Sequence, residues 1–350
     1  MGILGARENN MDNNNHNGKM RRKVIKQGHN TLTITLPTEW AKRFNLEAGS
    51  EIDIIERDNG LFITTEKNGH SRKAEIDITG MDNPTIWKYF MAVYREGYDE
   101  VVVKFDPNLK LDHPYKFYTR YRSDLKYGRE SEKENPVEFL QDLVNRFIGF
   151  EIISYDKNSV IIKEISEATS KEFDNSFRRV FLLLQEMIDD TCESLKTENP
   201  KLLRHIHEVD INLDKFHDYC IRILNKIGNK DARKTSLLFS TLYLIELLGD
   251  EFKNIAIHLF EDTVKGINFK NLLQMAEQRR EQLTLFFDCF YHFDIEKIKK
   301  IMDLDKKEFL TAKDKYKHTK SEEEKELLHH FRLMNKYINA LTELRIEMEF

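Results

Sequence analysis

The sequence of 350 residues predicts a multidomain α+β protein, in which a small β domain and a small α/β domain precede an all-α region. Three observations predict this fold class. Residues 31–36 alternate between threonine and an apolar side chain, the pattern of a half-buried strand. Residues 74–168 combine helical patterns with short apolar runs that are typical of strands. From residue 170 onward, Pro200 alone interrupts a series of helical periods.

Composition limits the class of protein further. The net charge is only -5 although a third of the residues are charged, so we expect any nucleic-acid contact to be a local patch. The absence of a run of eighteen apolar residues and of an export signal predicts a cytoplasmic protein with no membrane span. The cysteines stand isolated in apolar helical contexts and are expected to be buried free thiols; they are Cys192, Cys220 and Cys289.

The first domain is expected at residues 21–70, after an Asn-rich tail at 1–20 that we expect to be disordered. Its expected elements are a strand at 32–36 ended by Pro37, a short helix at 39–44 capped by Thr38, and a hairpin of strands 52–55 and 61–65. Such a short segment buries little apolar surface alone, which favours pairing with a second chain.

The segment RKVIKQGHNTLTITLPTEWAKRFNLEAGSEIDI resembles the AbrB/SpoVT/MazE swapped-hairpin DNA-binding domain. The resemblance implies a homodimer of interleaved hairpins that binds double-stranded DNA with basic residues. The candidate DNA-binding residues are Arg21, Arg22, Lys23, Lys26, Lys42 and Arg43. A solvated strand edge is the alternative for the first four, and ordinary helix surface for the last two. The apolar face that interleaving would cover consists of Ile34, Leu36, Ile52 and Ile54.

The second domain, residues 74–168, is predicted to be a small α/β sandwich. A β-α-β unit is expected from a strand at 74–80, a helix beginning near Pro84 and a strand at 101–105. A polar insertion at 109–135, a helix at 136–149 and a hairpin at 150–165 are expected to follow. The domain has neither a Gly-rich phosphate loop nor a catalytic constellation, so we expect no enzyme activity.

The third domain, residues 170–350, is predicted to be all-α. Helices are expected at 171–197, 201–228, 232–261, 267–292, 295–317 and 321–348. Six long helices with short connections predict two antiparallel three-helix bundles.

Two pairs of acids stand out in this region. Asp210 and Asp214 are four residues apart, as are Glu246 and Asp250, so each pair lies on one helix face. If the two rows face each other, they would repel unless a cation is bound, and carboxylates suit Mg, Mn, Fe or Zn. The alternative is that the rows face solvent or pair with Lys215 and Lys253, and then no metal is needed.

The stretches FRRVFLLLQEMIDDTCESLK and LGDEFKNIA resemble the PhoU family of phosphate-signalling proteins. The resemblance implies two three-helix repeats with metal-binding acid motifs. The order of the three domains resembles the archaeal PhoU-like phosphate uptake regulators. The second repeat departs from the pattern, because Asp303, Asp305 and Glu308 form no clean acid pair.

The sequence therefore predicts a DNA-binding transcriptional regulator of phosphate uptake or homeostasis, with a helical domain that senses or docks a partner. The alternative is an adaptor that does not bind DNA and regulates a phosphate transporter or sensor kinase by protein contact.

Overall fold

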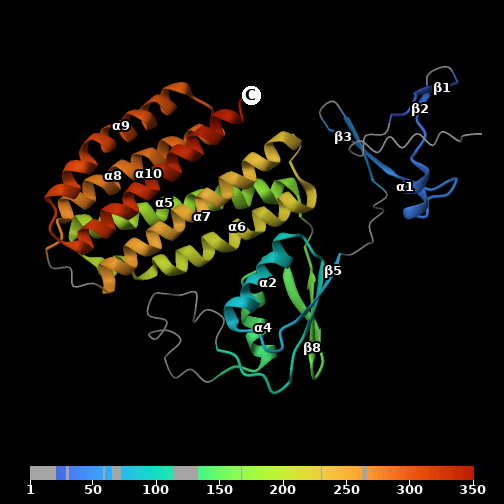
Figure 1. Ribbon diagram of the computed structural model, residues 1–350, viewed down its shortest axis with the longest axis horizontal. Coiled ribbons are helices and arrows are strands. Elements are labelled where there is room, and N and C mark those ends of the chain that lie inside the picture. Colours follow the sequence, from blue (N-terminus) through green and yellow to red (C-terminus); the bar gives the residue numbers. More distant parts are fainter. Residues whose placement is uncertain are drawn as a thin grey trace, which may run out of the picture. The chain divides into compact units, whose positions relative to one another are not determined.

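The computed structural model describes residues 21–28, 31–57, 60–64, 72–112, 133–166, 168–229, 231–261 and 266–350 (Figure 1). The expected tail at 1–20 and most of the polar insertion at 109–135 lie outside the described residues. The chain separates into two compact units, the first made of residues 1–56 and 61–69 and the second of residues 57–60 and 70–350.

The described part of the N-terminal unit consists of two short two-stranded sheets and one short helix. Strand β1 (Ile25–Gln27) pairs with β2 (Thr31–Thr33), and β3 (Asp53–Arg57) pairs with β4 (Gly60–Thr64). Helix α1 (Thr38–Arg43) lies between them in sequence. The predicted Thr38 cap is wrong, because Pro37 is the N-cap and Thr38 is already the first helical residue.

The second unit begins with the predicted β-α-β arrangement. Strand β5 (Lys73–Asp77) is parallel to β6 (Glu100–Lys104), and helix α2 (Asn83–Arg95) connects them. The Asp82 side chain caps α2 by accepting from the Thr85 backbone N–H at 2.9 Å, with proline in the first turn.

The sheet is completed by the predicted hairpin of β7 (Phe150–Tyr155) and β8 (Ser159–Glu164), which gives the strand order β5-β6-β8-β7. Helix α4 (Pro136–Val144) lies with α2 on one side of this sheet (Figure 1). The prediction that α4 extends to Gly149 is wrong. The amides of Arg146 and Phe147 bond to carbonyls three residues back, which tightens the chain into turns before β7.

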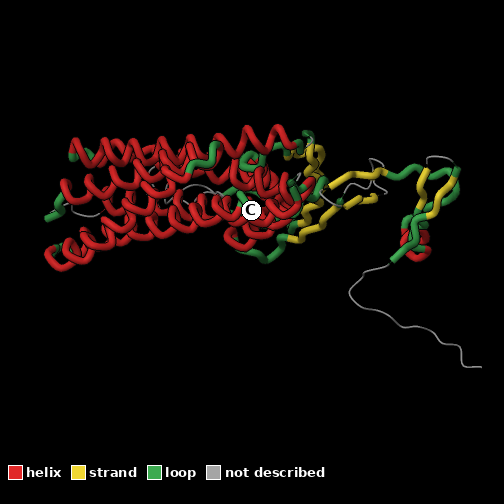
Figure 2. Tube along the Cα trace, turned by 90° about the horizontal axis from the view of Figure 1, so that it is seen from above, coloured by secondary structure: helices red, strands yellow, loops and turns green. Residues whose placement is uncertain are grey.

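Six long helices make up the rest of the described chain and lie side by side in Figures 1 and 2. They are α5 (Ser170–Thr197), α6 (Ile206–Ile227), α7 (Ala232–Glu261), α8 (Phe269–Tyr291), α9 (Ile295–His318) and α10 (Glu322–Glu347). One boundary differs from the expectation, because a 3₁₀ segment, η2 (Pro200–His205), precedes α6. None of the described helices is long and apolar enough to cross a membrane.

The helices form two halves, α5–α7 and α8–α10. The halves join where α5 packs on α8 and α7 packs on α10. Aromatic contacts reinforce the first junction, for example Phe181 against Phe286, Phe287 and Phe290. The three cysteines are free and buried in this core, as predicted.

Helix α6 also contacts the α/β domain. The fully buried Arg222 guanidinium donates to the carbonyls of Tyr94 and Tyr98 at 2.7 and 2.8 Å and pairs with Glu164. One turn later, Lys226 pairs with Asp99 and Glu164. The α/β domain and the helical bundle are therefore joined by buried, charge-assisted contacts.

Candidate functional site

The first candidate surface is the basic start of the N-terminal unit. Arg21, Arg22 and Lys23 precede β1, and Lys26 lies within it. Lys42 and Arg43 lie at the C-terminal end of α1, where the helix dipole stabilises cations. All six side chains are exposed, and none forms an ion pair with another described residue. These cations are free to contact an external anion.

The apolar side chains of the same unit are also uncovered. None of the described residues from 21 to 64 whose side chains are placed is buried. Ile34 and Ile54 of the predicted apolar face are 48% and 58% exposed, and Leu36 and Ile52 are only half-buried. Other exposed apolar residues of this unit are Val24, Ile25, Leu32, Phe44 and Leu61. A single chain leaves this surface in water, as a protein interface does before its partner binds.

The second candidate is the group of acids predicted on two helices. Helix α6 presents Asp210 and Asp214, and α7 presents Glu246 and Asp250. All four line one cavity of about 180 Å³. Of the arrangements that the sequence left open, the structure therefore has the two rows on one cavity rather than facing solvent. The α/β domain closes the cavity with four side chains that sequence reasoning did not assign to it: Trp87, Met91, Arg95 and Arg146.

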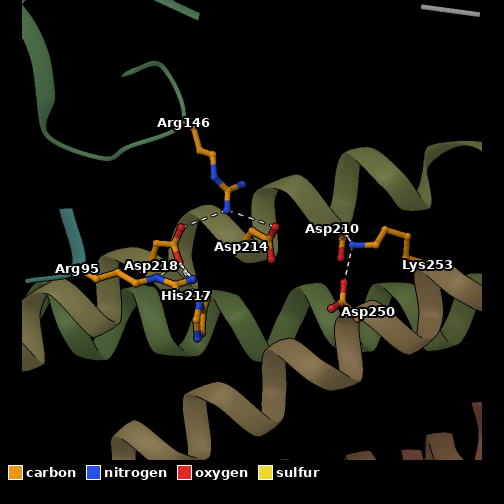
Figure 3. Close-up of polar contacts among 8 residues, drawn as sticks. All are labelled: Arg95, Arg146, Asp210, Asp214, His217, Asp218, Asp250 and Lys253. Atoms are coloured by element: carbon orange, nitrogen blue, oxygen red, sulfur yellow. Dashed lines mark hydrogen bonds and ion pairs between the residues drawn. The ribbon is translucent and has the colours of Figure 1, made fainter. Parts of the chain in front are cut away.

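Cations of the chain itself occupy this carboxylate cluster (Figure 3). The ammonium of Lys253 donates to Asp210 Oδ2 at 2.8 Å and to Asp250 Oδ1 at 2.5 Å. Nη2 of Arg146 donates to Asp214 Oδ2 at 3.3 Å and to Asp218 Oδ2 at 3.1 Å.

Asp218 is the most enclosed acid near the cluster. It is fully buried, and Nη2 of Arg95 approaches its Oδ1 to 2.5 Å, while His217 Nδ1 lies 3.2 Å from the same oxygen. Burial by itself would raise the pKa of Asp218, but Arg146, His217 and Arg95 hold it well below its usual range. Asp218 is therefore an anion at neutral pH and ties the α/β domain to α6.

The remaining acids outnumber their cations. Burial, followed by the charge of Asp214, raises the pKa of Asp210 to about 7 and that of Glu246 to about 8. Burial alone would lower the pKa of Lys253, but Asp210 and Asp250 raise it overall. An excess of negative charge helps to raise the pKa values of the acids and of Lys253 alike, because one ammonium faces several carboxylates.

The donor set does not fit a metal ion as these side chains lie. The Lys253 ammonium occupies the position between Asp210 and Asp250 that a shared cation needs. Metal binding at the four acids therefore stays a prediction. The sequence offered two lysines as alternative partners of these acids. Lys253 pairs with the acids, whereas Lys215 donates to the Asn145 carbonyl at 2.9 Å.

One group of possible metal ligands among the described residues was missed. Ligand atoms of Glu186, Asp190 and His205 lie within 4.8 Å of one another, and His205 Nε2 is 2.8 Å from Asp190 Oδ2. The i, i+4 spacing of the two acids was the available signal, but the turn that returns His205 to α5 is not visible in the sequence. All three side chains are at least partly exposed, as ordinary surface groups are.

The second half of the bundle has a different polar core. The guanidinium of Arg279 on α8 is fully buried and pairs with Glu308 on α9. Asp305, also on α9, accepts from the Asn335 amide at 2.5 Å. Asp305 and Glu308, which formed no clean pair in the sequence, are thus each matched to a donor on a neighbouring helix, whereas Asp303 is exposed.

Comparison with known families gives two matches. Residues 25–69 match the family of antidote-toxin recognition MazE, bacterial antitoxin. Residues 177–258 match the PhoU domain, and this range contains all four acids and Lys253. Both resemblances drawn from the sequence are thereby confirmed. The comparisons with curated proteins and with solved structures gave no match. The chain thus carries a MazE-type segment near its N-terminus and a PhoU domain in its helical part.

Proposed function

We propose that this protein is a transcriptional regulator that binds double-stranded DNA as a dimer through residues 21–69. The MazE-type match supports a DNA-binding regulator, and the PhoU match supports a role in phosphate regulation. Neither matched family is catalytic, which supports a regulator rather than an enzyme.

The observation that carries the proposal is the incomplete state of the N-terminal unit. Its exposed cations lack ion-pair partners among the described residues, and its apolar side chains lack cover. A second copy of the chain would cover the apolar side chains, and the phosphates of a DNA backbone would pair with the cations. Cations that precede and occupy one strand are suited to follow a duplex backbone.

The helical domain is assigned a docking or sensing role tied to phosphate supply. The cavity at the carboxylate cluster is a poor place for phosphate itself, because four acids line it beside three cations, Arg95, Arg146 and Lys253. Each of these cations already pairs with a carboxylate, so an incoming anion would have to compete for it. We therefore place the phosphate link in a partner that contacts this domain, such as a transporter or a signalling protein.

The test is DNA binding as a function of salt. We expect the full chain to bind duplex DNA, and the triple variant Arg21→Ala/Arg22→Ala/Lys26→Ala to bind more weakly. Each lost phosphate contact should reduce the slope of log K against log salt by roughly 0.9. Fluorescence anisotropy with a labelled genomic duplex measures both quantities.

The matched control removes cations from the second unit, with Lys299→Ala/Lys325→Ala. Lys299 is exposed on α9 and Lys325 is partly exposed on α10, and their loss should leave the slope unchanged. An unchanged slope in the triple variant would instead contradict DNA contact by the basic strand. Failure of the wild type to bind any duplex would favour the adaptor, in which the N-terminal unit only dimerises.

A further inference from the structure

The position of Lys253 in the carboxylate cluster is set by helix geometry. Glu246, Asp250 and Lys253 stand at i, i+4 and i+7 on α7, so all three project from one face. Lys253 is three residues after Asp250, and its long side chain reaches across to Asp210 on α6. The sequence of α7 therefore supplies two acids and their counter-cation together.

The Lys253 ammonium is placed as a bridging cation. Its side chain is 17% exposed, and its nitrogen donates to carboxylates from two different helices at 2.8 and 2.5 Å. An ammonium is a compact point charge with three donors, so it links two carboxylates as a small ion does. A metal ion shared by Asp210 and Asp250 would have to displace it.

The second half of the bundle contains the same kind of pairing. Arg279 contributes a fully buried guanidinium to Glu308, although the sequence and the helices differ from those of the first half. Each half thus pairs acidic side chains with a basic side chain of its own.

We propose that Lys253 is a built-in replacement for a metal ion, so that the carboxylate cluster is stable without metal and gains a divalent-cation site only when this ammonium is removed. The ligands of that latent site are Asp210 and Asp250, with Glu246 and Asp214 beside them. Carboxylate oxygens of this kind suit Mn²⁺ or Mg²⁺. The proposal concerns the PhoU domain alone and does not depend on DNA binding.

The experiment compares Mn²⁺ binding by the full-length wild type, Lys253→Met and Lys215→Met. Methionine keeps an unbranched apolar side chain but removes the charge. Lys215 is the matched control because it lies near the cluster but bonds to a backbone carbonyl. Bound Mn²⁺ is measured by elemental analysis after dialysis and by titration with paramagnetic resonance detection.

We expect the wild type and Lys215→Met to retain no stoichiometric Mn²⁺ and to melt at the same temperature with and without chelator. Lys253→Met should bind about one ion per chain, on the order of 100-fold more tightly than the wild type, and should melt higher when Mn²⁺ is added. Adding Asp250→Asn to Lys253→Met should abolish that binding.

Two results would overturn the proposal. One is a wild type that holds one Mn²⁺ per chain and melts lower after chelation. The other is a folded Lys253→Met variant that binds no more Mn²⁺ than the wild type. If Lys253→Met does not fold even with Mn²⁺ present, Lys253→Gln replaces it, and the wild-type metal content still decides the first half of the proposal.

Discussion

The N-terminal unit and the unit that follows it handle apolar and charged side chains in opposite ways. Among the described residues, the first unit buries none, and its six candidate DNA-binding cations form no ion pair. The second encloses a continuous apolar core and places even fully buried Arg222 and Asp218 against opposite charges.

The difference indicates where each unit finds its partners. Uncovered apolar groups and unpaired cations support the proposal that a second chain and an anionic ligand complete this unit. A unit that pairs its own buried charges is complete in structure. Substitutions in the second unit should therefore change stability, and substitutions in the first should change association and DNA binding.

The largest effect is expected from Asp218→Asn. The amide leaves Arg95 and Arg146 without their buried anion, and loss of one partner of a buried ion pair costs about 3–5 kcal/mol. The denaturant midpoint of the second unit, followed by circular dichroism, measures this loss. Asp189→Asn is the control, since that acid is 64% exposed and 3.8 Å from Arg280.

The same variant has a defined pH dependence. Because the pKa of Asp218 is held below its usual range, its contribution is present above the ordinary aspartate pKa of about 4 and is lost as pH falls through the folded value. The wild type and Asp218→Asn should therefore converge in acid. A difference that stayed constant down to strongly acidic pH would contradict a charge-based role.

A smaller effect is expected from Glu246→Gln at the carboxylate cluster. A raised folded pKa means that the folded state holds a proton which the unfolded state releases, so stability falls as pH rises from about 4.5 through the folded value of about 8. Glutamine does not titrate. The variant should melt roughly 2–4 °C higher than the wild type in alkaline buffer, a shift worth about 1 kcal/mol.

The control for this effect is Glu193→Gln, an exposed position on α5. Calorimetric scans at acidic and alkaline pH should give parallel changes for Glu193→Gln and the wild type. An equal pH response in Glu246→Gln would show that this carboxyl does not titrate within the cluster.

The smallest effect is expected at a surface pair. Lys325 lies 2.6 Å from Glu322 on α10, and Glu322 is 80% exposed. Exposed helical pairs are worth about 0.3–0.5 kcal/mol, so Lys325→Ala should barely move the denaturant midpoint. A loss as large as that of Asp218→Asn would mean that burial does not decide which ion pairs stabilise the second unit.

The sequence predicted the long helices well because apolar periodicity persists over many turns and prolines are rare. It placed the acid rows correctly, since residues four apart share a helix face. It did not predict that Arg95 and Arg146 reach the cluster, because pairing across domains leaves no local pattern. It gave Lys253 only as an alternative partner of the acids. In the structure the long Lys253 side chain reaches Asp210 on the neighbouring helix and pairs with it.

Sedimentation of the full chain tests most directly whether the N-terminal unit is completed by a second copy. We expect a dimer for the wild type, a monomer for Ile34→Glu/Ile54→Glu, and an unchanged dimer for the control Leu182→Glu, an exposed leucine on α5. Helical content should be equal in all three. A monomeric wild type, or a double variant that still sediments as a dimer, would contradict association through residues 21–69.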